Sequence, residues 1–151
     1  MNAQKRDYYV NYDFKGPFTV IESKCGKEPI LKNDRLQFNI PDNGVYLFNG
    51  ELKSGHIYER VFQINIDGTA TRIVDKHWPT ENTDKDTAGI EMIVGTRYGS
   101  YGSRTNNKNE KVNSISRFIE TNKIYSDKDE NRNHFKHDRL VNNLISECKN
   151  D

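Results

Sequence analysis

Two histidines stand at a spacing that could hold a metal ion. His134 and His137 lie three residues apart in a segment whose apolar pattern predicts a helix, so one helix face would carry both. The pair lacks the Cys-x-x-Cys spacing and the His-Glu motif that mark zinc sites. His137 also falls on the apolar stripe of that helix. We therefore expect its ring to pack with one nitrogen hydrogen-bonded, without a metal.

A run of acidic and amide side chains imitates a calcium-binding loop. Asp127, Asp129, Asn131 and Asp138 stand at ligand-like offsets. Arg132 occupies the position where such a loop needs glycine for its sharp bend. The segment also has the pattern of a helix start, because acids in a first turn suit the helix dipole. We therefore expect no cofactor.

The Gly-rich stretch 95–104 could be a phosphate cradle or a binding loop. A cradle needs backbone N–H groups at a helix N-terminus, and the next predicted element is a strand. Its Tyr and Arg side chains could stack on single-stranded nucleic acid, but the near-neutral net charge argues against that partner. A mobile loop is the favoured interpretation, because runs of Gly, Ser and Asn are first of all loop chemistry. If the protein is a binder, the candidate partner-binding residues are Arg97, Tyr98, Tyr101 and Arg104 of this stretch, together with Trp78. Trp78 is either a core residue, which is the favoured interpretation, or an exposed anchor.

Nucleophilic catalysis has little support in the sequence. No Gly-x-Ser-x-Gly motif is present, and His56 and His77 have no nucleophile placed near them. Cys25 precedes Gly26 in a predicted turn, without a helix behind it to lower the thiol pKa. We therefore predict no catalytic residues and a protein that is not an enzyme.

The two cysteines, Cys25 and Cys148, leave two states open. Buried free thiols are the favoured interpretation, since small apolar thiols are commonly buried without a bond. A disulfide is the alternative if the domain is exported, because such bonds persist in oxidising compartments.

Composition limits the partners and the compartment. The chain has 151 residues, 33% of them hydrophobic and 30% charged, with a formal net charge of +1. This balance provides no general attraction for nucleic acid or an anionic membrane. No apolar run is long enough to span a bilayer, and the N-terminus has no signal-peptide core. The chain is then cytoplasmic if complete as written, and extracytoplasmic if Met1 marks a trimmed exported domain.

Period-two apolar patterns and turn residues predict a mainly β fold. Strands are expected in 8–14, 17–23, 35–40, 44–49, 58–66, 69–74, 90–95 and 114–121. For the last of these, Val112, Ile115 and Ile119 would also fit a helical stripe. Tyr58, Phe62, Ile64 and Ile66 share a face, as is typical of a half-buried strand. Turns are expected at Lys15-Gly16, Asp67-Gly68 and in the Pro-Asp-Asn-Gly run at 41–44.

The C-terminal segment changes to a helical period. His137, Val141, Leu144, Ile145 and Cys148 recur at helical spacing. This pattern predicts an amphipathic helix packed on a sheet. The expected architecture is an antiparallel β-sandwich or open barrel of about 7–8 short strands over residues 1–125, with the helix of 126–151 packed on the same domain.

The strand patterns also resemble a known group of proteins. Lys-Gly-Pro before "TVI", "IP" two residues before a Gly, "IDG", "VGTRYGSYGS" and "RFIETNKI" resemble the corresponding strands and turns of a group of small bacterial β-sandwich domains without an assigned function. Many of its members are exported or lipid-anchored, and it has no catalytic residues to carry over. The resemblance covers roughly residues 8–125 and implies the same sandwich.

The function expected from these observations is binding without catalysis. The favoured partner is a protein or a cell-surface component, engaged through loops at one end of the sandwich. An immunity-type inhibitor that blocks a toxin and a small hydrolase-like enzyme acting on a polar substrate remain alternatives. Neither nucleic acid binding nor a membrane-spanning segment is expected.

Overall fold

The computed structural model describes residues 4–53, 57–75, 91–95, 101–106, 108–121 and 127–149. The described chain forms β1 (Gln4–Asn11), β2 (Gly16–Lys27), β3 (Leu31–Lys32), β4 (Arg35–Asn39), β5 (Val45–Phe48), β6 (Ile57–Ile64), β7 (Ala70–Asp75), β8 (Glu91–Gly95), β9 (Tyr101–Thr105), β10 (Lys111–Thr121) and α1 (Asp127–Glu147). The fold is therefore mainly β with one C-terminal helix, as predicted.

The strands make two mixed sheets. The first has the order β3-β4-β1-β6-β7, and the second has the order β8-β10-β2-β5, with β9 also paired to β10. A short parallel pairing of β7 with β8 links the two sheets. The described strands do not close into a barrel, because β3 and β5 lie at the two ends of the strand order. The expectation of purely antiparallel pairing was wrong. Strand β1 runs parallel to both β4 and β6, and β2 runs parallel to β5.

The main core lies between the two sheets. Tyr8 and Phe38 of the first sheet meet Phe18, Tyr46 and Phe48 of the second in one cluster of buried side chains. Phe38 stacks on Tyr8 at 5.4 Å between ring centroids and meets Phe48 edge-on at 5.0 Å. Aromatic pairs in these geometries add about 0.5–1.5 kcal/mol each beyond the area they bury.

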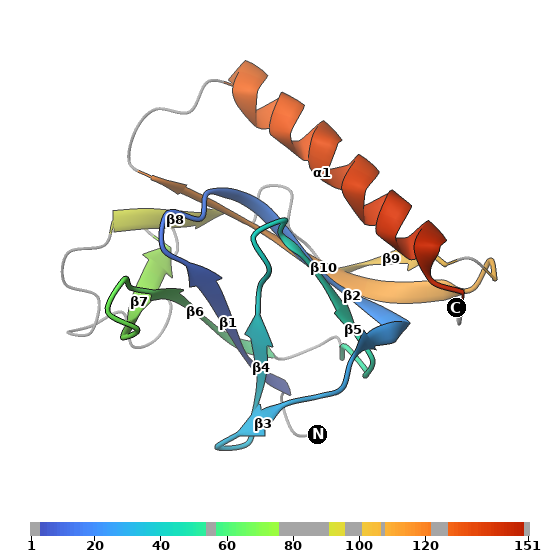
Figure 1. The fold of residues 1–151 in the computed structure, drawn as a ribbon, viewed down its shortest axis with the longest axis horizontal. Coiled ribbons are helices and arrows are strands. Elements are labelled where there is room, and N and C mark those ends of the chain that lie inside the picture. The colour runs from blue at the N-terminus through green and yellow to red at the C-terminus, as the bar shows by residue number, and fades with distance from the viewer. Residues whose placement is uncertain are drawn as a thin grey trace.

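Helix α1 lies across the second sheet, on the side away from the first sheet (Figure 1). Val141 and Ile145 pack against Ile21 of β2 and Val45 of β5 in a second buried cluster. The predicted apolar stripe is therefore docked, with Leu144 only partly buried at its edge.

Two turn glycines reverse the chain in different ways, one between the sheets and one within the first sheet. Gly44 has a φ of +80° and its N–H donates to the carbonyl of Pro41 at 2.8 Å. The turn at 41–44 is confirmed, but β4 and β5 belong to different sheets, so it is a crossing rather than a hairpin. The Asp67-Gly68 turn does close a hairpin, since β6 and β7 pair antiparallel.

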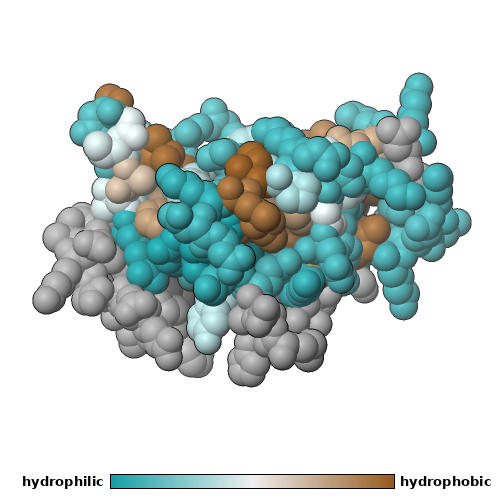
Figure 2. Space-filling view, turned by 90° about the horizontal axis from the view of Figure 1, so that it is seen from below, coloured by the Kyte–Doolittle hydropathy of each residue, from teal (hydrophilic) through white to brown (hydrophobic). Residues whose placement is uncertain are grey.

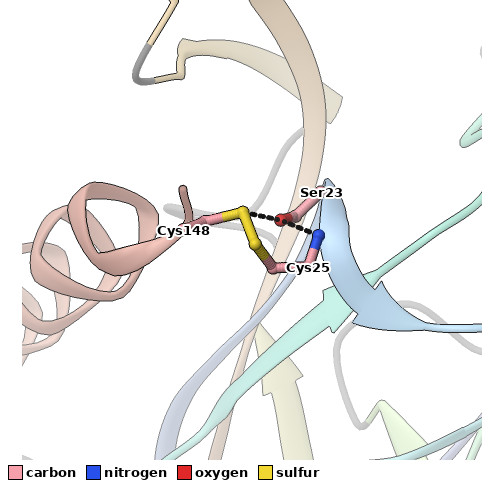
Figure 3. The surroundings of a disulfide bond; sticks show 3 residues. All are labelled: Ser23, Cys25 and Cys148. Carbon is pink, nitrogen blue, oxygen red and sulfur yellow. Dashed lines mark hydrogen bonds between the residues drawn. A yellow bond between two sulfur atoms is a disulfide. The ribbon is translucent and has the colours of Figure 1, made fainter. Parts of the chain in front are cut away.

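The two cysteines form a disulfide that joins β2 to the end of α1 (Figure 3). The Cα atoms of Cys25 and Cys148 are 5.7 Å apart, and Ser23 donates its hydroxyl to the sulfur of Cys148. The preference for free thiols was therefore wrong. The turn expected at Cys25 is also absent, because β2 continues through it to Lys27.

Candidate functional site

Strand β6 turns its largest apolar side chains away from the core, although their pattern predicted that they would face it. Val61 and Gln63 point into the core and are each 6% exposed. Tyr58 and Phe62 therefore lie on the outer face of the first sheet, where Tyr58 is 53% exposed. The prediction that this apolar set forms the buried face of the strand was wrong. Phe62 is partly buried on this face, but an aromatic side chain as exposed as Tyr58 on a regular strand is informative, because a half-buried strand usually turns such residues inward.

Neighbouring strands add charged and aromatic side chains to the same face. The parallel registers place Asp7 of β1 beside Arg60 of β6 and beside Gln37 of β4, and place Tyr9 beside Phe62. Tyr9 and Phe62 stack at 5.1 Å between ring centroids, and the Arg60 guanidinium lies 5.3 Å from the Phe62 ring. We call this set the Arg–aromatic face. It consists of Asp7, Tyr9, Arg35, Gln37, Tyr58, Arg60 and Phe62.

The carboxylate of Asp7 organises the Arg–aromatic face. Its Oδ1 accepts from Nε of Arg35 at 2.7 Å and from Nε of Arg60 at 2.8 Å. Its Oδ2 accepts from Nη2 of Arg60 at 2.8 Å and from the Gln37 amide at 3.1 Å. The side chain is 2% exposed, whereas those of Arg35 and Arg60 are 14% and 38% exposed. Both guanidinium groups are thus held in place by one acid beneath them.

These contacts keep the cluster charged. Burial by itself would raise the pKa of Asp7, but hydrogen bonds from Arg60, Arg35 and Gln37 outweigh it and hold this pKa below its ordinary value of 3.8. The hydrogen bond to Asp7 raises the pKa of Arg60. Near neutral pH the cluster is therefore two cations and one anion, with a net positive charge.

A second ionic cluster lies inside the sandwich. Glu59 of β6 accepts two hydrogen bonds from Arg117 of β10, at 3.0 and 2.8 Å, and one from the fully buried Arg6 at 3.4 Å. Arg6 also donates to the carbonyl of Lys53 at 2.6 Å. This cluster joins the two sheets, and burial together with Glu59 raises the pKa of Tyr8 above its ordinary range. Its side chains serve the packing of the sandwich.

A hollow of about 260 Å³ opens where α1 meets the β1–β2 turn, and His137 is among the residues that line it. Nε2 of His137 lies 2.7 Å from the hydroxyl of Thr19, which lies 2.8 Å from the hydroxyl of Ser116. Thr19 is fully buried, so its hydroxyl is out of a substrate's reach. His137 packs with a hydrogen-bonded nitrogen, as expected. His134 and the calcium-like acids of 127–131 lie outside the described side chains.

The loop residues predicted to bind a partner are described only in part. Trp78, Arg97 and Tyr98 lie outside the described residues. Tyr101 and Arg104 belong to β9, where a polar loop was expected, because that segment pairs antiparallel with β10. Arg104 donates to Asp138 of α1 at 3.2 Å, which links β9 to the helix. The structure thus brings Arg104 to the helix side, away from the Arg–aromatic face.

The residues of the Arg–aromatic face were absent from the sequence-based site. Asp7 and Arg35 are 28 positions apart, and Asp7 and Arg60 are 53 apart, so only the parallel pairing of three strands brings them together. A weak signal was available. Arg60 interrupts the apolar face of its strand between Tyr58 and Phe62, and pairing with an opposite charge is one reason for such an interruption.

Three comparisons with known proteins bear on the fold. No family model and no curated protein matches the chain. Among solved structures, the crystal structure of a "Putative Lipoprotein from Bacillus anthracis" is similar, with a TM-score of 0.66 and 14% sequence identity. The match covers 97% of this chain and 96% of that one, so the two share the fold over nearly their whole length. Within the described residues, no helix is both long enough and apolar enough to cross a membrane.

Proposed function

We propose that this protein is a non-catalytic binding module that works outside the cytoplasm and engages a cell-surface component through its Arg–aromatic face. The observation that carries the proposal is the outward orientation of Tyr58, Arg60 and Phe62 on a regular strand. Clusters of Tyr and Arg are the side chains most often found at the centres of binding surfaces. Strands also hold such groups more rigidly than loops do, which lowers the entropic cost of binding.

Two further observations support a place outside the cytoplasm. The disulfide of Cys25 and Cys148 requires a compartment in which thiols are oxidised. The similar structure from Bacillus anthracis is described as a "Putative Lipoprotein", which is compatible with a place outside the cytoplasm. The sequence-based resemblance to exported or lipid-anchored domains points the same way.

The surface around the face suits a polar partner. Seen from below Figure 1, the described residues are mostly hydrophilic, with an apolar patch near the centre of the view (Figure 2). Lys5 lies on the same side of β1 as Asp7, and it faces Tyr58 in the register with β6. A rim of this kind around aromatic anchors is typical of interfaces that form and dissociate.

The experiment is a binding assay of the labelled domain on intact cells of the encoding organism. Tyr58→Ala should weaken cell binding about tenfold or more, as expected for an aromatic anchor. Tyr12→Ala is the matched control, because Tyr12 is 50% exposed and Tyr58 is 53% exposed, but Tyr12 lies beyond the end of β1. Its binding should match wild type.

Two results would contradict the proposal. Equal effects of Tyr58→Ala and Tyr12→Ala would show that the Arg–aromatic face is not the binding surface. A loss of cell binding in Arg104→Ala, with Tyr58→Ala unaffected, would instead assign binding to the loops that the sequence suggested.

A further inference from the structure

We infer that Arg35 and Arg60 form a receptor for the carboxylate or phosphate group of an acidic cell-surface glycan. This inference rests on the proposed function and names the chemistry of the partner. Planar guanidinium groups are the preferred protein partners of both oxyanions, since parallel N–H groups match their geometry.

The donors that such a group needs are in place. Arg60 uses Nε and Nη2 on Asp7, and Arg35 uses Nε on Asp7 and Nη2 on the carbonyls of Arg6 and Tyr58. Among the described residues, Nη1 of neither guanidinium has an acceptor. Arg60 therefore keeps its Nη1 group and one N–H of Nη2 for an external oxyanion, whereas Arg35, whose Nη2 already donates twice, keeps Nη1 alone.

Asp7 does not neutralise the two arginines, so it does not take the place of an external anion. Both oxygens of Asp7 are occupied by four donors in all: Nε of Arg35, Nε and Nη2 of Arg60, and the amide of Gln37. Its one negative charge is shared by two guanidinium groups, so the cluster keeps a positive charge. Arg60 remains 38% exposed and can meet a ligand from solvent.

The neighbouring side chains favour a glycan over other anions. Tyr58 exposes about half of its surface beside Arg60, and aromatic rings pack well against the C–H faces of sugar rings. Lys5 adds a further cation on the same side of the sheet. Nucleic acid offers the same phosphate chemistry, but the near-neutral net charge of the chain argues against it, and the disulfide indicates an oxidising compartment.

The test measures binding of the purified full-length chain to four polymers. Polygalacturonate supplies carboxylates, a glycerol-phosphate polymer supplies phosphates, dextran is the neutral glycan, and oligo-dT represents nucleic acid. We expect binding to at least one of the two acidic polymers, none to dextran, and a marked loss of affinity as salt is raised. Binding to oligo-dT alone, or equal binding to dextran, would overturn the inference.

Variants then assign the binding to the two arginines. Arg60→Gln should weaken binding to the acidic polymer about tenfold or more, and Arg60→Lys should be intermediate because it keeps the charge but loses the fork. Arg139→Gln is the matched control, since it removes the same charge from an exposed position on α1. Equal losses in Arg60→Gln and Arg139→Gln would show a general charge effect and refute the site.

A folding defect and a failed proposal can be told apart. Thermal melts of each variant show whether it is folded, and Tyr58→Ala tests the same surface without touching Asp7. If Tyr58→Ala weakens binding to cells and no acidic polymer binds wild type, the glycan inference fails and the proposed function stands. If Tyr58→Ala leaves cell binding unchanged, the proposed function itself fails.

Discussion

At the scale of single residues, Asp7 is the group on which the Arg–aromatic face depends. It is buried among two arginines and an amide, so its removal leaves two guanidinium groups without their acceptor. Breaking a buried ion pair on one side costs several kcal/mol, because the remaining charge is still partly desolvated. The exposure of Arg60 reduces that cost.

We predict that Asp7→Asn lowers the free energy of unfolding by about 2–4 kcal/mol near neutral pH, as urea denaturation would show. The folded-state pKa of Asp7 is below its unfolded value of 3.8. Its contribution is therefore complete above that value and is lost as the pH falls through the lower, folded-state pKa. The gap between wild type and Asp7→Asn should narrow as the pH falls below 3.8.

Asp138→Asn provides the comparison for this prediction. Asp138 pairs with Arg104 across the surface, and its side chain is 60% exposed. Exposed pairs contribute about 0–1 kcal/mol, so this change should barely alter the unfolding curve. Equal effects of the two substitutions would mean that Asp7 is not a buried organising charge.

At the scale of elements, two turn glycines differ in a way that separates strain from crowding. Gly44 and Gly68 have similar φ values of +80° and +86°. A Cβ atom on Gly44 would lie 2.6 Å from the carbonyl oxygen of Pro17, whereas one on Gly68 would meet nothing within 4 Å. Both positions carry backbone strain with any other residue, but only Gly44 adds a clash with backbone.

We predict that Gly68→Ala costs about 1 kcal/mol from the positive φ alone. Gly44→Ala should cost about 3 kcal/mol or more, because the crossing between sheets must also shift. Gly44→Val should be worse still. Thermal and urea melts of the two alanine variants provide the comparison. Equal losses of stability in both would show that the chain at Gly44 does not pass close to the Pro17 carbonyl.

The helix gives a second prediction at this scale. Val141 is fully buried between α1 and the second sheet, whereas Leu144 is only partly buried. Val141→Ala should lower the free energy of unfolding by about 2 kcal/mol, from the lost burial and the cavity left behind. Leu144→Ala should lower it by less than the same substitution of a fully buried leucine would. The exposed Asn142→Ala should stay within about 0.5 kcal/mol of wild type in the same melts. An unchanged melting temperature in Val141→Ala would contradict the docking of the helix.

Elements were largely predictable from sequence, whereas their pairing was not. Alternation and turn glycines located most of the strands, and helical spacing located α1, because these signals are local. The parallel pairing of β1 with β4 and β6 depends on crossings between sheets, which leave no local signal. For the same reason the sequence pointed to Tyr58 and Phe62 as core residues and missed the cluster around Asp7.

At the scale of the whole molecule, one covalent bond ties the helix end to the second sheet. The disulfide closes a separation of 123 residues, which runs from the end of β2 to the end of α1. A loop of that size restricts the unfolded chain strongly, and the usual effect is about 2–5 kcal/mol, depending on the model used. The sequence could not decide between free thiols and a disulfide, because Cys25 and Cys148 come together only in the folded structure.

We predict that reduction, or the Cys25→Ser/Cys148→Ser double substitution, lowers the unfolding free energy by about 2–5 kcal/mol in urea. Adding a reducing agent should destabilise wild type and leave the double variant unchanged. If the reducing agent leaves the wild-type unfolding curve unchanged, the bond contributes nothing to stability.

The central claim is that the Arg–aromatic face, and not overall charge, brings this protein to a cell surface. The most direct measurement compares binding to intact cells for two double variants of equal net charge. Arg35→Gln/Arg60→Gln removes the two guanidinium groups of the face, and Lys108→Gln/Arg139→Gln removes two exposed cations elsewhere. The account predicts that the first variant, shown to be folded, loses about tenfold or more in affinity while the second binds as wild type does. Equal affinity of the two variants would contradict it.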